Sequence, residues 1–343
     1  MKFIYLFLFV GFLFSCKKNK IEPPVAPVEN TDLVLTESTV PFSPVANGTK
    51  FYKNISYGSH TRNKIDLFLP ASGTPTGLVI FIHGGGFIGG DKSIAYDNQP
   101  SQLFINQLLI QGIAFATINY QFLVSANTGG ILTPMNDCKR ALQFMRFHAS
   151  TLNIDKSKVV LMGNSAGAGT SLWLAFSDDM ADSNSSDPVL KESTRVKGVV
   201  AGETQGTYDI AEWHNTIFYQ YQAQGFTYQT VKNLVTEPLL KLFIGVNNLN
   251  DINTPEVLAK RQKCDYLNHL SSDDPEMHLD NSSINYTFPA DNNSLLHHPL
   301  HAKILKDRAG FVNVPCKANI PKMSIDTRNG ENMLDFVIRK VNE

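Results

Sequence analysis

One serine in the chain has the surroundings of an activated nucleophile. Ser165 is the centre of Gly163-Asn164-Ser165-Ala166-Gly167, which follows the apolar run 159–162 at once and opens a helical pattern over 165–177. A strand that turns sharply into a helix projects the central hydroxyl above the sheet, and small flanking residues leave room for the turn. The helix N-terminus also stabilises a developing negative charge. The alternative is a glycine-serine turn without chemistry.

A second motif, His83-Gly84-Gly85-Gly86-Phe87, follows the apolar run 78–82. Glycine amides can approach a substrate closely because no Cβ blocks the way. In acyl transfer, preset N–H donors stabilise the oxyanion, and each is worth about 3 kcal/mol of the barrier. A flexible loop is the alternative, but two such motifs at the ends of buried strands favour a common site.

Together the motifs resemble the HGGG-type esterase and lipase group of the α/β-hydrolase superfamily, closest to its carboxylesterase and feruloyl-esterase-like bacterial lipoproteins. Supporting matches are Ile65-Asp66-Leu67-Phe68-Leu69-Pro70, Asn119-Tyr120 and Asn136-Asp137. The resemblance is good over 50–200 and loose elsewhere. It implies that the backbone amides of Gly84, Gly85 and Ala166 form the oxyanion hole, that His83 positions the loop, and that no cofactor or metal is needed.

The chain departs from this group in the place of its general base. The group places a histidine on the loop after the last strand, but 302–343 contains none. Three histidines instead cluster in Leu296-His297-His298-Pro299-Leu300-His301. Because Pro299 favours the first turn of a helix and so holds the preceding loop rigid, we predict His298 as the base and His297 as the next candidate.

The acid that would orient this histidine is predicted to be Asp291, with Asp280 as a second candidate. The alternative is that the histidines cap a helix or face solvent. Glu203 follows the strand after the elbow, where it lines the pocket, forms a salt bridge or caps a helix.

The elements around these motifs alternate between strand and helix patterns. We expect a hairpin over 49–70, buried strands at 78–82, 113–118, 159–162 and 196–201, and helices at 101–110, 135–150 and 165–177. A weaker pattern continues with strands at 275–279 and 311–315 and helices at 299–307 and 330–341. This rhythm predicts an α/β-hydrolase fold, with a mostly parallel sheet between helices on both faces. The break over 203–272, rich in helical stretches and aromatics, predicts a helical cap insertion.

The N-terminus indicates export to a bacterial cell envelope. Residues 1–16 combine a basic start, an apolar run too short for a bilayer of about 30 Å, and Ser15-Cys16, which resembles a lipobox. We expect Cys16 to carry the lipid that anchors the protein to a membrane, facing the periplasm or the exterior; an ordinary secretory signal is the alternative. Residues 17–32 resemble a flexible tether, and 33–343 the hydrolase domain.

Composition narrows the partners. A hydrophobic fraction of 43% supports a large core, and a net charge of −1 argues against nucleic acid. Cys138, Cys264 and Cys316 lack metal-ligand spacing, so no metal site is predicted, and Cys138 is expected in the core.

Two functions follow from these residues. The first is a serine esterase that cleaves small-molecule or carbohydrate esters through an acyl-enzyme intermediate. The second, motivated by the displaced histidine, is a catalytically impaired pseudo-hydrolase that binds an acylated glycan or a protein partner.

Overall fold

A computed structural model describes residues 33–124, 129–283 and 286–343 of the 343-residue chain. The predicted signal peptide over 1–16, with Cys16, and the predicted tether over 17–32 lie outside the described residues. Within the described parts, no helix is long and apolar enough to cross a membrane.

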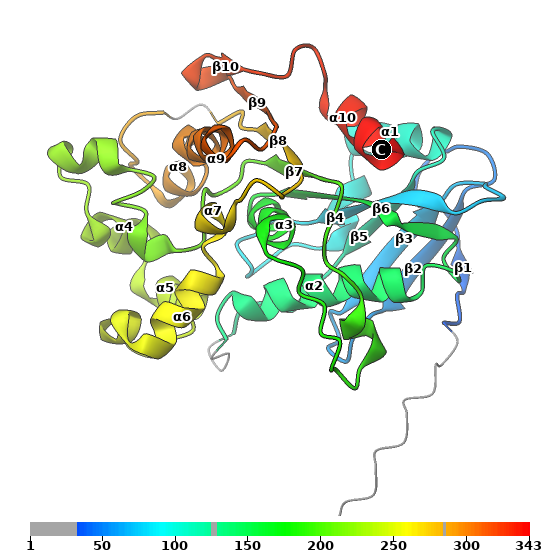
Figure 1. Ribbon diagram of the computed structural model, residues 1–343, viewed down its shortest axis with the longest axis horizontal. Coiled ribbons are helices and arrows are strands. Elements are labelled where there is room, and N and C mark those ends of the chain that lie inside the picture. The colour runs from blue at the N-terminus through cyan, green and yellow to red at the C-terminus, as the bar shows by residue number, and fades with distance from the viewer. Residues whose placement is uncertain (1–32, 125–128, 284–285) are drawn as a thin grey trace, which may run out of the picture. The chain divides into compact units, whose positions relative to one another are not determined.

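A ten-stranded sheet forms the centre of the fold, in the order β1-β2-β3-β5-β4-β6-β7-β8-β9-β10 (Figure 1). Neighbouring strands from β5 to β9 are parallel, whereas β1, β2, β3 and β10 pair antiparallel at the two edges. The strands are β1 (Glu37–Ser38), β2 (Lys50–Ser56), β3 (Lys64–Leu69), β4 (Thr76–Ile82), β5 (Ala114–Ile118), β6 (Ile154–Asn164), β7 (Gly198–Gly202), β8 (Glu276–Asp280), β9 (Cys316–Ile320) and β10 (Ile325–Asp326).

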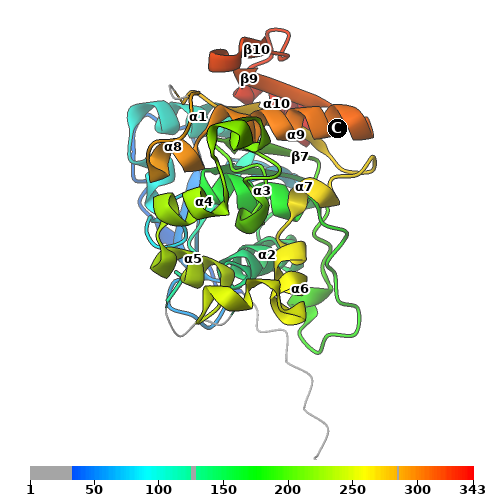
Figure 2. The ribbon, with the colours of Figure 1, turned by 90° about the vertical axis from the view of Figure 1, so that its left-hand side faces the viewer.

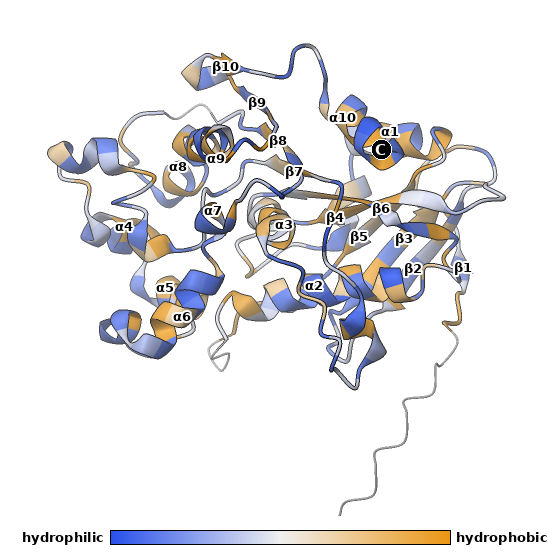
Figure 3. Ribbon diagram, viewed as in Figure 1, coloured by the Kyte–Doolittle hydropathy of each residue, from blue (hydrophilic) through white to orange (hydrophobic). Residues whose placement is uncertain are grey.

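Alternate residues of the central strands face two different cores. Leu78 and Ile80 pack with α2, α3 and α9, whereas Val79 packs with α1 and α10 on the opposite face. Successive side chains of a strand point to opposite faces of the sheet, and helices cover both faces. This explains why the parallel strands have continuous apolar sequences. Helix α3 is buried along its whole length and is largely orange in Figure 3. The helices of these layers are α1 (Gln99–Ile110), α2 (Leu132–Phe147), α3 (Ala166–Phe176), α9 (Pro299–Val312) and α10 (Met333–Asn342).

The predicted α/β-hydrolase fold is therefore confirmed. The hairpin, the four buried strands and the three helices expected in the first part of the chain all exist, with shifted ends.

The segment between β7 and β8 forms helices, as its sequence predicts. They are α4 (Tyr228–Val235), α5 (Glu237–Ile244), α6 (Pro255–Lys263) and α7 (Tyr266–His269), followed beyond β8 by α8 (Asn292–Leu296). Short 3-10 turns are η1 (Lys92–Tyr96), η2 (Pro188–Lys191), η3 (Ile210–Glu212), η4 (Tyr219–Gln224), η5 (Leu249–Asn253) and η6 (Pro321–Met323). Residues of this segment, Trp213 and Phe218 among them, share a third hydrophobic cluster with Leu295 and Leu300. The helices lie together beside the end of α3 (Figure 2).

The prediction of a strand over 311–315 is wrong. Phe311 and Val312 end α9, Asn313 takes a left-handed conformation with φ 63°, and β9 begins only at Cys316. Phe311 is 79% exposed, so the apolar pattern did not mark a buried strand. Cys138 lies in the core as expected, and the three described cysteines are free.

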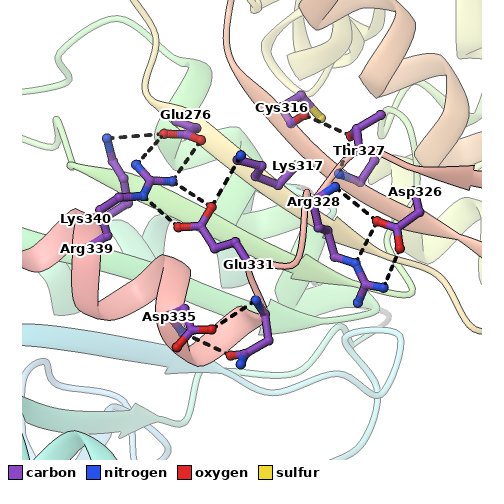
Figure 4. A network of polar contacts seen from close by, with 12 residues as sticks. Glu276, Cys316, Lys317, Asp326, Thr327, Arg328, Glu331, Asp335, Arg339 and Lys340 are labelled. Carbon is purple, nitrogen blue, oxygen red and sulfur yellow. Dashed lines mark hydrogen bonds and ion pairs between the residues drawn. The ribbon is translucent and has the colours of Figure 1, made fainter.

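The C-terminal helix is tied to the sheet by an ionic network (Figure 4). Arg339 of α10 donates to Glu276 at the start of β8 and to Glu331, and Lys317 of β9 lies 3.6 Å from Glu331. This network lies at the amino ends of the parallel strands, the edge opposite to the nucleophile elbow.

Candidate active site

Ser165 stands at the turn between β6 and α3. Its backbone is strained, with φ 51° and ψ −119°, and its amide donates to the carbonyl of Gly202 at 2.9 Å. Strained residues of this kind persist mainly at functional sites. The flanking glycines are required by space: a Cβ on Gly163 would lie 2.3 Å from the backbone of Gly167, and a Cβ on Gly167 would lie 1.9 Å from the carbonyl oxygen of Ile82.

The glycine loop after β4 lies against the elbow. A Cβ on Gly84 would be 2.9 Å from the Asn164 carbonyl oxygen and 3.2 Å from Ser165 Cβ. The loop is held from behind, because the Tyr120 hydroxyl donates to the His83 carbonyl at 2.8 Å and His83 Nδ1 lies 2.6 Å from the Gly84 carbonyl oxygen. This agrees with a positioning role for His83.

The three predicted oxyanion-hole residues surround the serine. Gly84 and Gly85 line the same cavity as Ser165, and Ala166 lines a second cavity with it. Ala166 is the first residue of α3, so its amide N–H has no acceptor within the helix and lies at the positive end of the helix dipole.

The structure brings His297, not His298, to the hydroxyl of Ser165. His297 Nε2 lies 2.9 Å from Ser165 Oγ, and its Nδ1 lies 2.9 Å from Asn293 Oδ1. The pKa of His297 lies below its usual value because the side chain is buried, and the negative charge of Glu203 partly opposes this shift. A neutral imidazole that accepts the serine proton at Nε2 is the form that nucleophilic catalysis needs.

The prediction that ranked His298 ahead of His297 is corrected by this geometry. His298 is the N-cap of α9: its Nδ1 accepts from the Leu300 amide at 3.1 Å and its Nε2 lies 3.0 Å from the Thr287 carbonyl oxygen. Both ring nitrogens are therefore occupied away from Ser165. His301 is likewise buried, with Nδ1 accepting from the Gly206 amide and Nε2 near the Leu295 carbonyl oxygen.

Asp291 is also placed away from the histidine it was predicted to orient. It is the exposed N-cap of α8 and accepts from the Ser294 amide at 2.7 Å. The second candidate, Asp280, accepts from Asn319 Nδ2. The Nδ1 partner is Asn293, which sequence reasoning missed. Its position four residues before His297 could have revealed it, because residues at that spacing share a helix face.

Glu203 lies at the edge of the site. It follows β7 with φ 48°, and its carboxylate accepts from the Ser282 amide at 2.6 Å, the Ser282 hydroxyl at 2.7 Å and Asn281 Nδ2 at 3.1 Å. Asn281 Nδ2 also donates to the His297 carbonyl at 3.1 Å. Glu203 lines the same cavity as Ser165 and His297.

Two cavities of unequal size meet at Ser165. The larger holds about 750 Å³ and opens beside His297; its walls include Phe81, Ile94, Phe104, Phe115, Met162 and the polar Asn98 and Ser101. The smaller holds about 50 Å³ between Ala166 and the helical segment after β7, and its walls include Phe87, Tyr208, Ile210, Trp213, Val235, Leu239 and Phe243. His297 lines the larger cavity and not the smaller one.

Another large cavity, of about 770 Å³, is lined by Pro275 and Pro315, which precede β8 and β9, and so lies at the opposite edge of the sheet. Its charged residues pair with one another, as Lys156 does with Glu192 and Arg195 with Asp274. We therefore assign it no role in the chemistry. In the described parts of the chain, no group of three or more His, Cys, Asp or Glu residues is arranged to hold a metal ion.

Fold and site together define an α/β hydrolase with a serine at its elbow. The sequence model of the BD-FAE family matches residues 65–299, more than half of the chain. The chain belongs to the BD-FAE family.

Among curated proteins, the chain is 24% identical over 240 residues to a probable isoprenylcysteine alpha-carbonyl methylesterase, ICMEL1, from Arabidopsis thaliana, covering 70% of this chain and 45% of that protein. It is 31% identical over 134 residues to the ICMEL2 protein of the same plant, covering 38% and 29%. The chain thus spans less than half the length of these relatives.

Two solved structures share the fold. One is a truncated carbohydrate esterase from gut microbiota, with a TM-score of 0.61, 17% identity, and coverage of 88% of this chain and 99% of that one. The other is an acetyl ester-xyloside bifunctional hydrolase from Caldicellulosiruptor lactoaceticus, with a TM-score of 0.51, 18% identity, and coverage of 85% and 82%.

Proposed function

We propose that this protein is a serine carboxylic ester hydrolase that works through an acyl-enzyme intermediate. The observation that carries the proposal is the contact between Ser165 Oγ and His297 Nε2, at 2.9 Å on a strained elbow. The esterase names of relatives and structural neighbours support the same reaction class.

In the first half-reaction, Ser165 Oγ attacks the ester carbonyl carbon while His297 Nε2 takes its proton. The carbonyl oxygen becomes an oxyanion, which the amides of Gly84, Gly85 and Ala166 stabilise. Collapse of the tetrahedral intermediate breaks the bond to the alcohol, which leaves with the proton from His297. Water then attacks the acyl-enzyme, with His297 again as the base, and releases the acid and the free serine.

The two halves of the ester occupy different cavities. The leaving alcohol must lie where His297 can protonate it, and His297 lines only the larger cavity. The acyl group then occupies the smaller, apolar cavity beside Ala166. Because one water needs about 10–15 Å³ of such space, a cavity of about 50 Å³ accommodates only a few heavy atoms.

We therefore propose a short acyl group on a bulky alcohol as the substrate, with acylated carbohydrates as the class. The polar Asn98, Ser101 and Glu203 in the larger cavity suit sugar hydroxyls. A carbohydrate esterase and an acetyl ester-xyloside bifunctional hydrolase share the fold, which supports this substrate class.

The test is hydrolysis of p-nitrophenyl acetate and of acetylated xylo-oligosaccharides by residues 33–343. Turnover of both that disappears in Ser165→Ala supports the proposal. Equal turnover by wild type and Ser165→Ala contradicts it.

A second function is favoured by one observation: the partner of His297 Nδ1 is the exposed amide of Asn293, not a carboxylate. A pseudo-hydrolase that binds an acylated glycan without cleaving it would keep the fold and both cavities. It would bind the oligosaccharide in calorimetry while releasing no acetate.

We also propose that the protein is a lipoprotein of a bacterial cell envelope, anchored through Cys16 and facing the periplasm or the exterior. The lipobox-like Ser15-Cys16 and the polar stretch after it support this proposal. An envelope address suits an enzyme that meets acylated carbohydrate outside the cytoplasm.

A further inference from the structure

The site poses a problem of charge. In a serine hydrolase, the imidazolium that forms on the base is stabilised by a carboxylate at Nδ1. Among the described residues, Nδ1 of His297 is paired with the neutral side chain of Asn293, which is exposed on α8. A neutral amide fixes the ring and its tautomer, but it supplies no negative charge.

Glu203 is the one carboxylate among the described residues that line the larger cavity with Ser165 and His297. Its carboxylate accepts three hydrogen bonds, from the Ser282 amide, the Ser282 hydroxyl and Asn281 Nδ2, so both of its oxygens serve as acceptors. Asn281 Nδ2 joins it to the backbone carbonyl of His297. Along the chain, Ser165, Glu203 and His297 also occur in the order serine, acid, histidine that α/β hydrolases use.

The local backbone is consistent with a functional position. Glu203 holds φ 48°, a left-handed conformation that glutamate rarely adopts, and its amide donates to the Asp280 carbonyl at 2.9 Å. This conformation fixes the start of the side chain at the carboxyl end of β7. Strain of this kind is retained where the geometry of a site requires it.

We propose that the two tasks of the third triad member are divided: Asn293 orients His297 at Nδ1, while Glu203, held by Asn281 and Ser282, supplies the negative charge from the cavity wall. Both are positioning residues that act through His297. The inference rests on the proposed function of Ser165 and His297, and it goes further by assigning the origin of the charge.

Other titratable groups from the surrounding elements do not supply this charge. Burial lowers the pKa of His298 to about 4 and of His301 to about 3, and it also lowers the pKa of His83, so all three are neutral. Asp280 at the end of β8 accepts a hydrogen bond from Asn319 Nδ2, and the exposed Asp291 accepts one from the Ser294 amide. Neither of them lines the cavity that Ser165 and His297 share.

The experiment measures kcat, KM and the pH profile of kcat/KM for wild type, Glu203→Gln, Asn293→Asp and the double variant. Glu203→Gln is expected to lower kcat by about tenfold or more, because the imidazolium of His297 loses a stabilising charge. For the same reason the pKa of His297 falls, so the acidic limb, the low-pH side of the kcat/KM profile, should move to lower pH. Asn293→Asp in the Glu203→Gln background is expected to restore kcat and move the limb back, because a carboxylate now meets Nδ1.

Asp291→Asn is the matched control. It removes one charge from the start of α8, the helix that carries Asn293, but keeps the N-cap of that helix, since asparagine caps as well as aspartate. Its acidic limb should stay in place. A Glu203 that only binds substrate would change KM and leave the limb unmoved, which overturns the proposal.

Failure of this inference is separable from failure of the proposed function. If wild type does not turn over and Ser165 is unreactive, the function itself is wrong. If wild type is active and Glu203→Gln keeps its kcat and its limb, only the origin of the charge is wrong.

If Glu203→Gln does not fold, the single variant Asn293→Asp decides. The added carboxylate at Nδ1 joins the charge of Glu203, so the variant should raise kcat about two- to threefold and move the acidic limb to higher pH. A gain of about tenfold or more would mean that the native site lacks an effective charge, contrary to the proposal.

Discussion

Ser165 and His297 stand 132 positions apart in the sequence, and their side chains meet at 2.9 Å. The serine comes from the turn after β6, and the histidine from the junction of α8 and α9, before the last parallel strand. Three contacts fix that junction: Gln205 Nε2 donates to the Leu296 carbonyl, Asn281 Nδ2 to the His297 carbonyl, and His298 caps α9. In the proposed mechanism, a base at this position replaces one on the loop after β9.

The neighbouring histidines should therefore respond differently to substitution. His297→Asn is expected to lower kcat by about 10²–10⁴-fold, the usual contribution of a general base, while the protein stays folded. His298→Asn keeps a residue that can cap α9 and should retain kcat within a few-fold. Steady-state kinetics with p-nitrophenyl acetate check both. A large loss in His298→Asn with normal activity in His297→Asn would reverse the assignment.

Acid stability should depend on His298 and His301. Burial lowers their pKa values from 6.5 to about 4 and about 3, so the folded protein keeps both neutral while the unfolded chain binds protons. Their contribution is therefore complete above pH 6.5 and is lost as the pH falls toward 4 and below. For His298 the shift corresponds to about 3 kcal/mol.

Thermal unfolding between pH 7 and pH 4 measures this effect. His298→Asn should flatten the fall in Tm with decreasing pH, whereas Ser59→Asn, at an exposed position without an ionisable side chain, should leave it unchanged. Parallel curves for all three proteins would show that His298 carries no such linkage.

The small cavity should set the length of the acyl group. Leu239→Ala removes side-chain volume from its wall, and each added methylene is worth about 10-fold or more in specificity. The ratio of kcat/KM for p-nitrophenyl butyrate over acetate should rise by about tenfold. Ile94→Ala, in the larger cavity, should leave that ratio unchanged. An equal rise in both variants would contradict the division of the ester between the cavities.

The proposed lipid anchor predicts a change of location without a change of fold. Cys16→Ala should release active protein from the membrane fraction, because a lipidated cysteine is the anchor that the sequence offers. Metabolic labelling with a clickable palmitate analogue should mark wild type and not the variant. A Cys16→Ala protein that stays in the membrane pellet would argue for another anchor.

The parts of the site that are local in sequence could be predicted. The elbow around Ser165 and the loop of Gly84 and Gly85 depend on short motifs at strand ends, and their backbone demands are visible in the glycines. The choice between His297 and His298 could not be predicted, because adjacent residues point in directions that depend on where α8 ends and α9 begins. The position of Glu203 depended on long-range contacts with Asn281 and Ser282, which no local pattern contains.

The same distinction holds for the fold. Strands buried on both faces were predictable from continuous apolar runs such as 78–82, and the alternation with helices indicated a parallel sheet. The strand near 311–315 was misplaced because Phe311 and Val312 continue α9 instead. Without a buried partner, Phe311 remains on the surface, and only tertiary packing reveals this.

The most direct measurement of the central claim is covalent labelling of the nucleophile. Folded protein is treated with a fluorophosphonate probe at pH 7.5, and intact mass and peptide mapping identify the adduct. We expect a single adduct on Ser165 that forms rapidly in wild type, at least about 10²-fold more slowly in His297→Asn, and not at all in Ser165→Ala. Folded wild-type protein that takes up no label, or takes it up at another residue, would contradict the assignment of Ser165 as an activated nucleophile.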